Sequence, residues 1–198
     1  MPAMTGDNQR MVSSNLASFV ESGLPYSITY SFLPDGAQGT FATLRAMVAC
    51  VRGEVPPDFS GYQSESIRQL AEALVYGAMD RADEVRALLL YCRDSIAYRL
   101  HPFDQQRVQD AARTVQIGSG DCVSKSVLLA TLLASLGHRP RFVVQSEGGC
   151  EYSHVYVEAL DESGRWVALD PVYERAEPGW SQPLPDGGFE TTWEIFEG

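Results

Sequence analysis

Cys122 follows the short segment GSGD (residues 118–121) and begins a long apolar stretch. The glycines allow the backbone to turn sharply into a helix, so we expect the thiol in the first helical turn. Free N–H groups and the positive end of the helix dipole favour a thiolate there, the nucleophilic form of cysteine. If a histidine acts on the thiol as well, its pKa should fall below the roughly 8.5 of a free cysteine. The same N–H groups could hold an oxyanion. From this segment alone, a buried structural cysteine is an equally good interpretation.

His154 and Asp170 occur in two short segments with the composition of strands, joined by the turn-forming sequence DESG (residues 161–164). If the hairpin pairs Leu160 with Gly164, the imidazole and the carboxylate face each other, with Cβ atoms roughly 4.5–5.5 Å apart. The carboxylate would then accept the imidazole N–H and fix its tautomer. A slip of one residue would place the two side chains on opposite faces of the sheet.

The three residues together supply a nucleophile, a proton acceptor and a group that orients the acceptor. We therefore predict a catalytic triad of Cys122, His154 and Asp170. The other two histidines fit this role less well, because His101 precedes a proline in a loop and His138 follows a glycine at a predicted helix end.

The elements that must position these residues run in a simple order, with helices first and strands later, apart from one early strand. Helices are predicted at residues 40–52, from 64, at 81–97, 105–115 and 122–136, and strands at 26–32, 141–145, 153–160 and 166–170. This order predicts an α+β fold, in which N-terminal helices and a central buried helix carrying Cys122 pack on an antiparallel sheet. We expect three regions: a loose arm at 1–24, one domain at 25–175, and a Pro- and Gly-rich tail at 176–198 that wraps the domain.

The composition excludes several classes of protein. The 198 residues carry a net charge of −11 and are 44% apolar, which suits one folded domain and excludes wholesale disorder. The acidic balance, with a single lysine, argues against a nucleic-acid partner. The N-terminus lacks the apolar core of a signal peptide, and no apolar stretch approaches the roughly 20 residues needed to span a membrane.

The cysteines Cys50, Cys92, Cys122 and Cys150 are widely spaced and form no CxxC pair. Without a signal peptide this spacing favours free thiols over disulfides, and no histidine is placed to complete a zinc site. Cys50 and Cys92 fall on apolar helix stripes and should be small buried side chains. We expect no metal and no cofactor, and we expect Lys125 on the solvated surface.

Three motifs resemble those of the transglutaminase-like superfamily of papain-type cysteine enzymes: GDC (residues 120–122), SHVYV (153–157) and WVALDP (166–171). The resemblance extends from about residue 83 to residue 170. It implies that Cys122 is the nucleophile, His154 the general base and acid, and Asp170 the orienting residue. It also implies acyl transfer through a thioester, on a polypeptide or a peptidoglycan peptide. The fold alone does not decide among protease, amidase, deamidase and crosslinking enzyme.

The segments LPDGAQGT (residues 33–40) and LRAM (44–47) resemble small transglutaminase-like proteins of Mu-like and other tailed phages and prophages. This implies an enzyme of the bacterial cytoplasm or the virion, for example a tail component with other tail proteins as partners. Two alternatives stay open: a structural tail or assembly protein that uses the fold without turnover, and an effector that modifies a host protein. The complete triad favours an enzyme, whereas packing of both termini into neighbouring subunits would favour the structural role.

Overall fold

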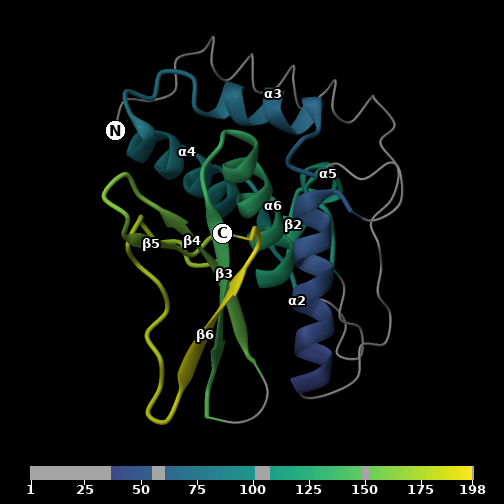
Figure 1. Ribbon diagram of the computed structural model, residues 1–198, viewed down its shortest axis with the longest axis vertical. Helices are drawn as coiled ribbons and strands as arrows, with labels where there is room; N and C mark the ends of the chain where they lie inside the picture. Colours follow the sequence, from purple (N-terminus) through teal and green to yellow (C-terminus); the bar gives the residue numbers. More distant parts are fainter. Residues whose placement is uncertain (1–36, 55–60, 101–107, 149–151, 198) are drawn as a thin grey trace.

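The computed structural model describes residues 37–54, 61–100, 108–148 and 152–197 of the chain (Figure 1). The helices are α2 (Ala37–Arg52), α3 (Glu65–Leu74), α4 (Arg81–Asp94), α5 (Ala111–Ile117) and α6 (Cys122–Ser135). The strands are β1 (Ala97–Tyr98), β2 (Ser119–Gly120), β3 (Pro140–Ser146), β4 (His154–Leu160), β5 (Trp166–Leu169) and β6 (Phe189–Glu194). The predicted arm and early strand, together with His101 and Cys150, lie outside the described residues.

Helix α6 is the centre of the molecule. Its residues 123–134 are all buried, because the sequence is apolar nearly all round and the helix packs against α2, α3, α4 and α5 as well as against β3 and β4 (Figure 1). Gly137 follows the helix with a φ of 77°, the left-handed conformation that commonly ends a helix. The prediction of a central buried helix is confirmed.

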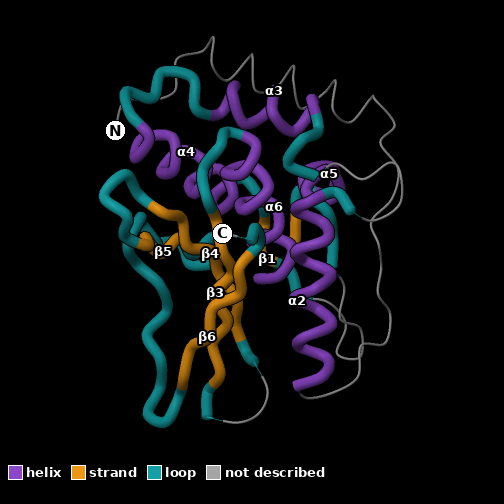
Figure 2. The backbone as a smooth tube through the Cα atoms, viewed as in Figure 1, coloured by secondary structure: helices purple, strands orange, loops and turns teal. Residues whose placement is uncertain are grey.

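The main sheet has the strand order β5-β4-β3-β6, and every neighbouring pair in it is antiparallel (Figure 2). Alternate residues of its strands, such as Phe142, Val144 and Val157, are buried in the same core as the apolar residues of α6. The other face carries polar residues, among them Arg141 and Glu158. Helices and antiparallel strands are therefore segregated, and the α+β prediction is confirmed.

Two short strands place the turn before the central helix. Helix α4 ends at Asp94 instead of continuing to residue 97, and Ala97 and Tyr98 pair in parallel with Ser119 and Gly120. The N–H of Ala97 donates to the Gly118 carbonyl over 2.9 Å. This pairing ties the end of α4 to the segment directly before Cys122.

The C-terminal region is more than a wrapping tail. The local pattern indicates no strand after residue 170, but residues 189–194 form β6, which pairs with β3 along its length. Trp193 lies opposite Phe142 in this pairing and contacts Phe41, with ring centroids 5.6 Å apart. Trp193 thus packs against the core, and Ile195, directly after β6, is fully buried. Among the described helices none is long and apolar enough to cross a membrane.

Candidate active site

Cys122 is the first residue of α6, as predicted. Asp121 caps the helix, and its carboxylate accepts a hydrogen bond from the Ser124 N–H over 2.9 Å. Gly120 is required for this tight entry, because a Cβ atom at that position would lie 2.6 Å from the Cβ of Ser124. The local sequence therefore delivers the thiol to the N-terminus of a long, rigid helix.

The thiol lies against the beginning of β4. The backbone N–H groups of Val155 and Val123 donate hydrogen bonds to the Cys122 sulfur. One turn further along α6, the hydroxyl of Ser126 donates to the Val155 carbonyl over 3.1 Å. These contacts hold the start of the helix against the strand residue that directly follows His154.

His154 and Asp170 are in direct contact. The Nε2 atom of His154 lies 2.8 Å from Oδ2 of Asp170, and Oδ1 of Asp170 accepts from the Val172 N–H over 3.1 Å. The carboxylate is fully buried, and the imidazole side chain is 9% exposed. A buried carboxylate with partners at both oxygens is held in one orientation, and it holds the ring in turn.

The register of this hairpin differs from the predicted one by two residues. The structure pairs Leu160 with Trp166 and Val157 with Leu169. Continuing that register makes Asp170 a diagonal neighbour of His154, where the predicted register makes it directly opposite. A shift of two residues keeps every side chain on its predicted face, so the two residues still meet.

Burial raises the pKa of the Cys122 thiol to about 12, and the nearby carboxylates of Asp121 and Asp170 add to the rise. Burial therefore acts against the low pKa that the helix N-terminus and a histidine partner are expected to give. The two N–H donors from Val155 and Val123 lower the pKa, but desolvation outweighs them. Cys122 as a residue is only partly buried all the same. It needs a proton acceptor, rather than the helix dipole alone, to become nucleophilic.

Aromatic side chains that are not among the predicted site residues lie around the histidine. The Tyr173 ring meets the His154 ring edge to face, with centroids 5.6 Å apart, and Trp180 packs on Tyr173 at 5.4 Å. Tyr98 lies on the helix side of the site, where burial and the charges of Cys122 and Asp121 raise its pKa to about 12. The position of Tyr173, three residues after the aspartate, is the one signal that could have suggested it.

Lys125 is buried, which contradicts the prediction of a solvated lysine. Its side chain donates to the carbonyls of Ile96, over 2.7 Å, and of Arg93, over 3.3 Å, near the end of α4. Those carbonyls lie where the α4 ladder runs out, so the ammonium replaces water there. Desolvation lowers the Lys125 pKa. The prediction is wrong because α6 is buried on every side, and the side that carries Lys125 packs against the end of α4.

The remaining candidate groups lie away from the thiol. His138 is buried at the far end of α6, with Nε2 2.9 Å from Oε2 of Glu84. Cys50 and Cys92 are buried free thiols, as predicted. Within the described parts of the chain, no three His, Cys, Asp or Glu side chains lie close enough together to hold a metal ion.

The chain matches one protein family and, more distantly, several solved structures. The model of the transglutaminase-like superfamily matches residues 68–171, just over half of the chain, and this range includes Cys122, His154 and Asp170. No curated protein matches the chain.

Solved structures give more distant likenesses. A candidate protease from Parabacteroides distasonis superposes with a TM-score of 0.52 and 14% identity, over 69% of this chain and 26% of that one. A candidate cysteine protease from Cytophaga hutchinsonii has a TM-score of 0.48 and 16% identity, over 68% and 43% of the two chains. Rad4–Rad23 bound to a 6-4 photoproduct UV lesion has a TM-score of 0.32 and 13% identity, over 86% and 37%. The chain spans about a quarter of the first structure and less than half of the other two, and the first match shows a shared fold alone.

Proposed function

Since the chain belongs to the transglutaminase-like superfamily, we propose that it is a cysteine acyl-transfer enzyme with a triad of Cys122, His154 and Asp170. The observation that supports this best is the 2.8 Å contact between His154 Nε2 and Asp170 Oδ2. It occurs beside Val155, whose N–H contacts the Cys122 sulfur. Both contacts support the assignment of a nucleophile, a base and an orienting carboxylate to one site at the start of α6.

The hydrogen bond to Asp170 decides which imidazole nitrogen reacts. With the ring N–H at Nε2 donating to the carboxylate, Nδ1 carries the lone pair and takes the proton from the Cys122 thiol. Thiolate and imidazolium then form together, so the charge of each offsets the desolvation that keeps the isolated thiol protonated. Asp170 stabilises the imidazolium without taking its proton.

Acyl transfer then proceeds in two halves. The Cys122 thiolate attacks the carbonyl carbon of an amide, and backbone N–H groups at the start of α6 stabilise the oxyanion. The C–N bond breaks as His154 gives its proton from Nδ1 to the leaving amine, which leaves a thioester on Cys122. Water or a second amine, deprotonated by His154, attacks the thioester and releases the thiol.

The identity of the second nucleophile separates a peptidase or amidase from a transamidase, and both are included in the proposal. A polypeptide or a peptidoglycan peptide stays the predicted substrate. A phage or prophage origin and a role in the virion also stay predictions from the N-terminal resemblance, because neither the fold nor the matches bear on them.

Thioester trapping tests the proposal. The full chain is incubated with pooled peptides from digested casein and from digested peptidoglycan, with hydroxylamine as the amine. Mass spectrometry then follows acyl adducts on the Cys122 peptide and peptide hydroxamates in solution. The proposal expects both products in the natural protein and neither in Cys122→Ser. Equal product in the two proteins, or none in either, would instead favour the structural alternative without turnover.

A further inference from the structure

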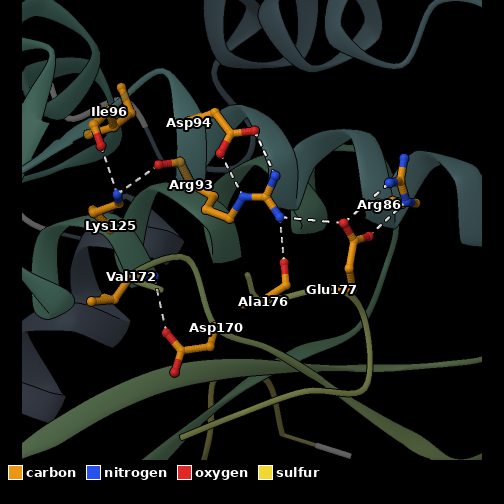
Figure 3. A network of polar contacts seen from close by, with 9 residues as sticks. All are labelled: Arg86, Arg93, Asp94, Ile96, Lys125, Asp170, Val172, Ala176 and Glu177. Carbon is orange, nitrogen blue, oxygen red and sulfur yellow. Dashed lines mark hydrogen bonds and ion pairs between the residues drawn. The ribbon is translucent and has the colours of Figure 1, made fainter. Parts of the chain in front are cut away.

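Arg93, near the end of α4, contacts both the helix that begins with Cys122 and the segment that follows Asp170 (Figure 3). Its backbone carbonyl faces Lys125 on the helix that begins with Cys122. Its guanidinium faces Ala176 and Glu177, on the segment that follows Asp170. One residue thus joins the element that carries the nucleophile to the segment that follows the orienting aspartate.

The helix side of this connection is a buried ammonium. Lys125 is 1% exposed, and its Nζ donates to the Ile96 carbonyl over 2.7 Å and to the Arg93 carbonyl over 3.3 Å. A buried charge without hydrogen-bond partners is costly, so these contacts resist breaking. Because Lys125 lies one turn after Cys122, they fix the first turns of α6 against the end of α4.

The aspartate side is a set of charged hydrogen bonds. The Nη1 atom of Arg93 donates to the Ala176 carbonyl over 2.7 Å and lies 3.5 Å from Oε1 of Glu177. Asp94 accepts from Nε and Nη2 of the same guanidinium, over 2.6 and 2.8 Å, and so orients it. Arg86, two turns earlier on the same face of α4, contacts Glu177 through Nε and Nη2 at 2.9 and 3.3 Å.

The segment to which Arg93 donates also shapes the catalytic pair. Its Val172 N–H donates to Asp170, and its Tyr173 ring packs edge to face on His154. Ala176 itself is fully buried. A movement of this segment would therefore change the orientation of the carboxylate and of the imidazole together.

We propose that Arg93 is a positioning residue, which sets the Asp170 segment, and through it His154, relative to the helix that carries Cys122. The proposal rests on the proposed function, because the geometry that it protects is that of the triad. The side chain of Arg93 is only 9% exposed, whereas that of Arg86 is 42% exposed and, among the described residues, contacts the Glu177 carboxylate alone. Arg86 therefore provides a matched control, an arginine from the same helix to the same segment.

The test follows alkylation of Cys122 by iodoacetamide from pH 5 to pH 10, peptide by peptide, in Arg93→Met, Arg93→Lys and Arg86→Met. Misplacement of catalytic groups by about 1 Å costs up to roughly a hundredfold in rate. We expect Arg93→Met to lower the His154-dependent rate near pH 7 by about tenfold or more, and to lower the rate near pH 10 less, because direct ionisation of the thiol contributes more there. Arg93→Lys should recover part of the loss, since it keeps one donor for the Ala176 carbonyl. Arg86→Met should stay within about twofold of the natural protein.

Urea unfolding of each variant separates positioning from stability. A merely structural role would lower the urea midpoint and leave the shape of the pH profile intact, and that result for Arg93→Met would overturn the inference. If Arg93→Met does not fold, Arg93→Lys decides in the same way. If alkylation of the natural protein near pH 7 is no faster than that of His154→Ala, the proposed function itself fails, and the inference fails with it. If Cys122 of the natural protein is alkylated faster near pH 7 than that of His154→Ala, and Arg93→Met reacts equally fast, only the inference about Arg93 is overturned.

Discussion

The His154 ring directs Nε2 at Oδ2 of Asp170, 2.8 Å away, although the two residues are diagonal and not directly opposite in the hairpin. The second carboxylate oxygen is already held by the Val172 N–H. The carboxylate therefore has little freedom to turn, and the ring keeps one tautomer and one orientation. In the proposed triad this leaves Nδ1 as the atom that exchanges a proton with Cys122.

Replacing His154 by alanine should make Cys122 less reactive than an ordinary thiol. Burial and nearby carboxylates raise the pKa of Cys122 to about 12, so without a base only about one thiol in ten thousand is ionised at pH 8. We expect the iodoacetamide rate of His154→Ala to rise about tenfold per pH unit up to that pKa. At pH 7, Cys122 of the natural protein should react with iodoacetamide roughly a hundredfold faster, or more, than Cys122 of His154→Ala.

The rates are measured from the mass of each cysteine peptide after timed labelling. Cys50 and Cys92 are buried and provide internal controls, because they should label only after unfolding in urea. Coincident pH profiles for the natural protein and His154→Ala would contradict base assistance by His154.

Replacing Asp170 by asparagine should slow the same reaction less than the loss of His154 does. The amide oxygen can still accept the Val172 N–H, so the fold is retained. Its NH₂ group would face Nε2 and favour the tautomer with the proton on Nδ1, which cannot accept a proton from the thiol. We expect a rate about tenfold to a hundredfold lower at pH 7.

Glu174→Gln is the matched control for Asp170→Asn, because it removes an exposed carboxylate from the same segment. It should change the Cys122 labelling rate by less than about twofold. An equal effect of the two substitutions would mean that Asp170 acts through general charge and not through its contact with His154.

The candidate triad could be predicted because its signals are local. A glycine turn before an apolar helix, a histidine in a strand and an aspartate at a strand end each follow from neighbouring residues. The hairpin register was missed because Asp161 closes the turn with its own side chain. Its Oδ1 accepts from the N–H groups of Ser163 and Arg165, each over 2.8 Å, and this makes the loop longer than the sequence suggests.

The burial of Lys125 and the existence of β6 could not be predicted in the same way. Lys125 is buried because the carbonyls of Arg93 and Ile96, about thirty residues earlier in the chain, accept its protons. The strand β6 exists because β3, more than forty residues before it, offers a free edge. Such partners come together only in the folded chain, so local pattern cannot indicate them.

Stability should fall at alkaline pH, and Cys50 should account for part of the fall. Burial, with a smaller effect of Asp110, raises the Cys50 pKa to about 12, whereas in the unfolded chain it is about 8.5. Between pH 8.5 and pH 12 the thiol loses its proton in the unfolded chain but keeps it in the native state. The free energy of unfolding is therefore unaffected below pH 8.5, and it falls by about 1.4 kcal/mol per pH unit as the pH rises toward 12. Cys50→Ala should cost about 1–2 kcal/mol at pH 8 through the cavity, and this gap should close above pH 9.

Urea unfolding at pH 8, 9 and 10 measures the gap. Val51→Ala makes a cavity at the neighbouring, equally buried position and removes no titrating group. Its cost in unfolding free energy should therefore not depend on pH. A Cys50→Ala cost that is equally constant from pH 8 to pH 10 would contradict the raised pKa.

Replacing Asp110 by asparagine should stabilise the protein above pH 6 and leave it nearly unchanged at pH 4. Burial raises the pKa of Asp110 from 3.8 to about 6, although its carboxylate caps α5 by accepting the Arg113 N–H over 2.7 Å. Between these two pH values the native state binds more protons than the unfolded state, so stability falls as the pH rises and stays lowered above pH 6. The full cost in free energy of unfolding is about 3 kcal/mol.

Asparagine keeps the cap and resembles the protonated acid, so Asp110→Asn should raise the free energy of unfolding by about 1–3 kcal/mol at pH 7. Urea unfolding of both proteins at pH 4, 5, 6 and 7 tests this, and a gain that is the same at every pH would exclude titration of Asp110 as its cause.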